Sequence, residues 1–80
     1  SIFTAFPNPT SNSINCSYNN LGEEEKITIS IFDQYSKLIK EITENAQKGN
    51  NLFTFDLSQF SNGVYFVVLD NIKNTYSNKI

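Results

Sequence analysis

Apolar and polar residues alternate with a period of two along much of the chain, and helical periodicity is nearly absent. Three segments, 13–18, 26–32 and 51–57, each place three apolar side chains on one face. This pattern is typical of strands in a sheet that packs one face on a core and exposes the other face to solvent. The apolar positions are Ile14, Cys16 and Tyr18, then Ile27, Ile29 and Ile31, then Phe53, Phe55 and Leu57.

The run from Val64 to Leu69 is apolar on both faces. Because it is short and rich in β-branched and aromatic residues, it predicts a central strand better than a helix. Alternate residues of the run, Tyr65, Val67 and Leu69, are expected to face the core. The other three are expected to lie under a neighbouring loop or a partner.

The polar segment before this run contains Gly63, two residues ahead of Tyr65. The spacing predicts a tyrosine corner, in which a tyrosine at the start of a central sandwich strand bonds to upstream backbone through its hydroxyl. Gly63 would supply backbone freedom for the turn. Leu57 and Phe60, three residues apart, would then close the end of the core.

Two further strands are less regular. Residues 38–42 break strict alternation, which indicates a bulge or a short strand near Lys40, although a helix over 34–47 can also be drawn there. Residues 74–80 alternate weakly and would close the domain at an edge, where an exposed last strand could pair edge to edge with a second copy. Five turn-rich breaks separate these segments and predict six or seven strands. The expected fold is an all-β, immunoglobulin- or fibronectin-like antiparallel sandwich of about seven strands.

Composition narrows the class of protein. Eighty residues form one domain at most. The chain lacks methionine and starts at Ser1, so we expect a piece, residues 1–80, excised from a longer protein. No apolar run approaches the roughly 18 residues that a membrane helix needs. The net charge of −2, with six lysines and no arginine, argues against nucleic acid as a partner.

The inventory of reactive side chains argues against catalysis. Cys16 is the single cysteine, so no internal disulfide can form, and its pattern predicts a buried apolar side chain. No histidine is present, which removes zinc sites and Ser-His or Cys-His pairs. Asp33, Asp56 and Asp70 sit at predicted strand ends or turns, where structural roles are common. We therefore expect no enzyme activity, no cofactor and no metal.

The two ends of the chain carry a family resemblance. Phe6-Pro7-Asn8-Pro9-Thr10-Ser11, followed by a strand, resembles the start of type A sorting domains of the bacterial type IX secretion system. Its two prolines predict a stiff, extended lead-in. The later segments 27–33, 37–42, 56–67 and 75–80 resemble the family's other strands, in the same order. Three differences are Tyr35-Ser36 in place of a glycine, Val68 at an often basic position, and an end at Ile80.

The resemblance implies a C-terminal address on a larger secreted protein of the Bacteroidetes group. The cargo, covalently linked on the N-terminal side, would pass the periplasm and cross the outer membrane through the type IX translocon. A sortase-like peptidase would then cut the domain off, leaving the cargo secreted or joined to the cell surface. The residues expected to matter are Pro7, Asn8 and Pro9 near the processing boundary, Gly63 and Tyr65 at the corner, and Lys79 and Ile80 as terminal recognition strand.

Two other hypotheses remain open on the sequence. The first is an accessory carbohydrate- or protein-binding sandwich of an extracellular enzyme, with Phe3, Phe6 or Tyr35 stacking on a sugar. The second is a structural spacer, which predicts that removing it leaves export unchanged. A flat exposed aromatic strip would favour the first of these.

Overall fold

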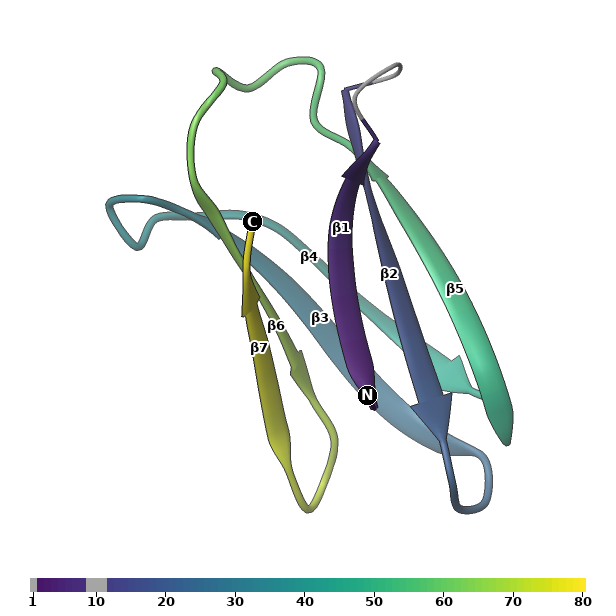
Figure 1. The fold of residues 1–80 in the computed structure, drawn as a ribbon. Coiled ribbons are helices and arrows are strands. Elements are labelled where there is room, and N and C mark those ends of the chain that lie inside the picture. The colour runs from purple at the N-terminus through teal and green to yellow at the C-terminus, as the bar shows by residue number, and fades with distance from the viewer. Residues whose placement is uncertain (1, 9–11) are drawn as a thin grey trace.

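The computed structural model describes residues 2–8 and 12–80 and is all-β, as predicted. Within those ranges the seven strands are β1 (Phe3–Asn8), β2 (Ser13–Asn20), β3 (Glu25–Asp33), β4 (Leu38–Ala46), β5 (Gly49–Asp56), β6 (Tyr65–Asp70) and β7 (Thr75–Lys79). They form two antiparallel sheets, ordered β1-β2-β5 and β4-β3-β6-β7. The sheets pack face to face as a sandwich (Figure 1).

The core lies between the sheets and consists of the faces that alternation predicted. Ile29 and Ile31 on β3 and Val67 on β6 have no exposed surface. They pack with the apolar face of β2, where Ile14 and Cys16 are buried. Burying these side chains supplies most of the favourable free energy of folding, at about 25 cal/mol per Å² of apolar area.

β1 was not expected as a strand. Pro7 and Asn8 are its last two residues, paired with Ile14 and Ser13 of β2. The proline is tolerated because β1 is an edge strand. Phe3 and Ala5 contribute buried side chains, so the first strand is part of the core and not a lead-in to it. Pro9, the third residue of the predicted boundary, lies outside the described residues.

β4 replaces the helix that could be drawn over 34–47. The predicted bulge is confirmed: Ile31 pairs with Lys40 while Phe32 pairs with Leu38, which leaves Ile39 as the extra residue. On the outer face of β6, Val68 is partly buried and Phe66 is 36% exposed, so the described segments cover this face in part.

The chain changes sheets between β4 and β5, over residues 47–48. The Asn51 side chain secures this corner, since its Oδ1 accepts the Gln47 N–H at 2.9 Å and its Nδ2 donates to the Gln47 carbonyl at 2.8 Å. Gly49 begins β5 at φ 96°, a conformation that favours glycine. The sandwich is therefore closed on this side by a tight connection.

On the opposite side, β1 and β7 are the adjacent edges of the two sheets, and they contact each other. The Asn78 side-chain amide, on β7, donates to the Phe3 carbonyl on β1 at 3.1 Å. The first and last strands are thus held together. β7 closes the four-stranded sheet at its edge, as the sequence predicted.

A polar network lies at the end of the sandwich that contains the β6–β7 turn. The Tyr18 hydroxyl donates to Glu25 Oε1 at 2.5 Å, and the Asn71 amide donates to the same hydroxyl at 3.2 Å. Burial, and next the bond to Glu25, raise the pKa of the Tyr18 phenol. Glu25 therefore has a structural partner. Its place in the acidic run Glu23-Glu24-Glu25 is, by contrast, typical of a solvated segment.

Candidate binding pocket at the end of the sandwich

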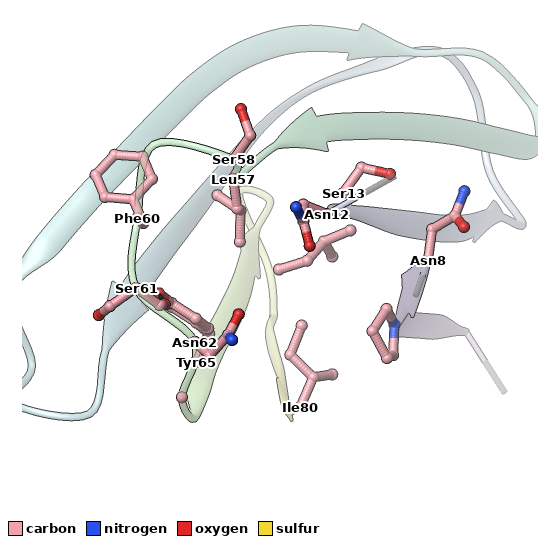
Figure 2. Close-up of a pocket in the computed structure, with 13 residues that line it drawn as sticks. Asn8, Asn12, Ser13, Leu57, Ser58, Phe60, Ser61, Asn62, Tyr65 and Ile80 are labelled. Atoms are coloured by element: carbon pink, nitrogen blue, oxygen red, sulfur yellow. Dashed lines mark hydrogen bonds between the residues drawn. The ribbon is translucent and has the colours of Figure 1, made fainter. Parts of the chain in front are cut away.

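The candidate site is a cavity of about 400 Å³ at the end of the sandwich away from the β6–β7 turn. Three separate parts of the chain line it: the β1–β2 hairpin, the segment that crosses from β5 to β6, and the C-terminal residue. Figure 2 shows Tyr65 and Asn62 on one side, Asn8 on the other, and Ile80 between them. The lining residues are Pro7, Asn8, Asn12, Ser13, Ile14, Leu57, Ser58, Phe60, Ser61, Asn62, Gly63, Tyr65 and Ile80.

The crossing segment is shaped by short-range hydrogen bonds. The Ser58 N–H donates to Asp56 Oδ1 at 2.9 Å in an Asx-type turn, a structural role of the kind expected for Asp56. This bond, with a second one from the Ser58 side chain, lowers the pKa of the Asp56 carboxyl. The Leu57 N–H donates to the Asn12 carbonyl at 3.0 Å and ties the segment to the β1–β2 hairpin. Leu57 is buried and Phe60 packs against the core, so both close its end as expected.

Tyr65 forms the predicted corner. It starts β6, packs partly buried against the core, and donates its hydroxyl to the Ser61 carbonyl four residues upstream. Gly63 lies between them at φ 159°, a positive value that residues with a side chain rarely adopt, so the turn favours glycine for its backbone conformation. A Cβ added there would meet no heavy atom within 4 Å. The hydroxyl bond thus holds the loop that borders the cavity.

Ile80 is anchored to the same residue. The Ile80 N–H donates to the Tyr65 carbonyl at 2.9 Å, and the Tyr65 N–H donates to the Ile80 carbonyl at 3.0 Å. This pair extends the β6–β7 ladder to the end of the chain. Lys79 lies in β7, exposed and opposite Phe66, and it is not among the residues that line the cavity.

Five of the seven residues singled out from the sequence therefore border one cavity: Pro7, Asn8, Gly63, Tyr65 and Ile80. Sequence reasoning did not assign Asn12, Ser13, Ser58 or Asn62 to a site. They occur in turns or at a strand start, where Asn and Ser are common, so their residue types alone did not distinguish them.

The lining of the cavity is mixed in polarity and uncharged in its described side chains. Among the described residues that line it, amides and hydroxyls combine with the apolar groups of Ile14, Leu57, Phe60 and Ile80, and Tyr65 is the one ionisable side chain. No group of three or more metal-ligating residues occurs anywhere in the described ranges. Such a surface suits an uncharged peptide segment, which would find hydrogen-bond partners beside apolar contacts.

The three aromatic residues considered for sugar stacking do not form one strip. Phe3 is buried in the core. Phe6 lies in β1 of the three-stranded sheet, whereas Tyr35 lies in the turn after β3 of the other sheet. The carbohydrate-binding hypothesis gains no support from them.

The family model described as "Secretion system C-terminal sorting domain" matches residues 4–80. The chain therefore belongs to this family, that of the type IX secretion sorting signals, and its role is to direct a protein for export to the cell surface or medium. The family consists of sorting signals and not of catalysts. No curated protein matches the chain. Among the described residues, no helix has the length and apolar character of a membrane span.

The corner hydrogen bond can be tested by replacing Tyr65 with phenylalanine. We expect the free energy of unfolding to fall by about 0.5–1 kcal/mol, the low end for a hydrogen bond, because solvent reaches this one. Urea denaturation followed by circular dichroism would measure the change. Tyr35→Phe is the matched control, since Tyr35 is 82% exposed and the same change there should have almost no effect. Equal losses at both positions would contradict the corner's role.

Proposed function

We propose that the cavity at the end of the sandwich is the surface by which the type IX translocon recognises this domain. The observation that supports this is the meeting of Pro7, Asn8, Gly63, Tyr65 and Ile80 around one cavity whose described lining side chains carry no formal charge. These residues lie far apart in sequence. They belong to β1, to β6 and the segment before it, and to the position that follows β7. The cavity is complete only when the hairpin, the crossing segment and β7 are all in place, so recognition there would select folded domains.

In this proposal the domain travels with a cargo joined to its N-terminal side, through the periplasm and across the outer membrane. A sortase-like peptidase then separates the two at the cell surface, where the cargo is released or attached. We place the cut on the N-terminal side of Phe3. A cut at Pro7-Asn8 would remove β1, whose Phe3 and Ala5 are buried in the core.

Export can be tested with a fusion of residues 1–80 to the C-terminus of a periplasmic reporter, expressed in a host with a working type IX system. We expect the reporter to reach the surface or the medium. A host lacking the translocon should keep the same fusion in the periplasm. Retention of the fusion by the competent host would contradict the sorting function for this chain.

The cavity itself can be tested with Asn62→Lys in the same fusion. Asn62 is exposed and lines the cavity, so the domain should still fold while the added charge occupies the site. We expect export to fall about tenfold or more, because desolvating an unpaired charge costs more than the 1.4 kcal/mol that a factor of ten represents. The reporter activity outside the cell, relative to the total, measures the effect.

Asn74→Lys is the matched control, since Asn74 is exposed and belongs to the β6–β7 turn. That turn lies at the opposite end of the sandwich (Figure 1). The control variant adds the same charge and should leave export unchanged. Normal export of the Asn62 variant would show that recognition lies elsewhere on the domain, while leaving the sorting function intact.

A further inference from the structure

The four edge strands of the sandwich differ in how they are protected against pairing with other chains. β4 has the bulge at Ile39 and carries Lys40, Glu41 and Glu44. β1 contains Pro7, and β7 is held beside it by the bond from Asn78 to Phe3. Bulges, charges, proline and covering segments are the usual means by which edge strands avoid further pairing.

β5 has none of these features over seven consecutive residues. Residues 49–55 contain neither a charged residue nor a proline, and β5 pairs with β2 in unbroken register from Ser13–Asp56 to Asn20–Gly49. Its other side pairs with no strand in the described part of the chain. Figure 1 shows β5 at the outer margin of its sheet. Leu52, at the middle of this stretch, is 66% exposed.

The sheet to which β5 belongs is almost free of charge. β1, β2 and β5 contain one charged residue, Asp56 at the end of β5, and all six lysines lie outside them. On the outer face, Leu52 lies beside Ser17 of β2, which lies beside Thr4 of β1. A charged partner strand would find almost no opposite charges on this sheet to pair with. A second uncharged strand would leave no charge unpaired.

We propose that the free edge of β5 pairs antiparallel with β5 of a second copy of this chain. Because the uncharged stretch 49–55 has Leu52 at its centre, pairing about a two-fold axis places Leu52 opposite Leu52 of the second copy and Asn50 opposite Thr54. The two three-stranded sheets then form one continuous sheet of six strands. No like charges face each other in this register, and the Leu52 side chains cover one another.

A fused cargo leaves this interface accessible. It would join the domain at β1, the opposite edge of the same sheet, with β2 between. The end cavity is lined by no residue of 49–56, so dimerisation and recognition at the cavity use different surfaces. The dimer should be weak, because it depends on one strand pair.

Two charge variants of the 80-residue chain, Leu52→Lys and Leu52→Glu, provide the test. The wild-type chain should show reversible, concentration-dependent dimerisation by sedimentation equilibrium. Each variant alone should bind itself about tenfold more weakly or worse, because two like charges are opposed and an apolar contact is lost. An equal mixture of the two variants should recover the dimer, since lysine then faces glutamate across the axis.

Ser77→Lys and Ser77→Glu, on the exposed face of β7, are the matched controls and should dimerise like the wild type. Hydrogen exchange gives a second measurement: the outward-directed amides of β5 should become protected as concentration rises, while those of β4 do not. A chain that stays monomeric at all concentrations would overturn the proposal. So would a dimer that is insensitive to both Leu52 changes, because it would use another surface.

Discussion

Replacing Ile29 with alanine should lower the free energy of unfolding by about 3–4 kcal/mol, within the range for large-to-small changes in a packed core. Ile29 has no exposed surface and lies in β3, between Ile42 on β4 and Leu69 on β6. Its neighbours are fixed by two strand ladders and cannot easily collapse into the space. Equilibrium urea unfolding, followed by circular dichroism, measures the loss.

The loss is large relative to the total. An 80-residue domain is expected to have roughly 4–12 kcal/mol of stability, at 0.05–0.15 kcal/mol per residue. Leu52→Ala is the control, because it also shortens an aliphatic side chain in the middle of a strand, but one that is 66% exposed. We expect it to cost less than about 1 kcal/mol when measured in dilute monomer. Similar losses at both positions would contradict the assignment of the core.

Strict alternation predicted the core because it depends on a local property of the strand. Successive side chains point to opposite faces, so Ile27, Ile29 and Ile31 could be assigned together without knowledge of their neighbours. The same logic located the tyrosine corner, whose hydrogen bond joins residues four apart. Predictions from local patterns of this kind hold in the folded chain because tertiary contacts reinforce the same local structure.

β1 shows where the local pattern was insufficient. Phe3 and Ala5 do alternate with Thr4 and Phe6, but Pro7 in the same segment favoured a stiff lead-in over a paired strand. Proline is acceptable there only because β1 lies at an edge, and edge position is a property of the whole sheet. The partial cover of the outer face of β6 has the same origin, since how much of Phe66 is covered depends on the paths of distant segments.

The cavity was partly predictable for a similar reason. Pro7, Gly63, Tyr65 and Ile80 were found as members of sequence motifs, yet nothing in the motifs places them around one space. Bringing these residues around one cavity requires the antiparallel pairing of β6 with β7 and the hydrogen bond from the Leu57 N–H to the Asn12 carbonyl. Both are long-range consequences of sandwich closure.

Alkaline pH should destabilise the fold through Cys16. Its side chain is fully buried, and burial raises the pKa of the thiol from 9.0 to about 12. Below pH 9 the thiol is protonated in both the folded and the unfolded chain, so it has no effect on the pH dependence. Between pH 9 and about 12 the unfolded chain loses this proton while the folded chain keeps it. Stability is therefore present below the unfolded pKa and lost as the pH rises.

The expected slope is about 1.4 kcal/mol of unfolding free energy per pH unit, so about 3 kcal/mol is lost two units above the unfolded pKa. Tyr18 adds to the loss at higher pH, because burial and the bond to Glu25 raise its pKa from 10.0. Urea unfolding under reducing conditions, between about pH 8 and 10, measures the onset of this loss. Because tyrosine and lysine side chains begin to titrate in the same range, the contribution of the thiol is taken from a comparison with Cys16→Ala.

Cys16→Ala removes the titrating group and separates the two contributions. At neutral pH the variant should lose about 1 kcal/mol, because one small buried group is gone. Between about pH 8 and 10 its stability should be nearly flat while that of the wild type falls, so the two curves converge as the pH rises. Parallel curves would mean that the thiolate is accommodated in the folded chain. In that case the interior between β2 and its neighbours would be open to water, contrary to the packing seen around Cys16.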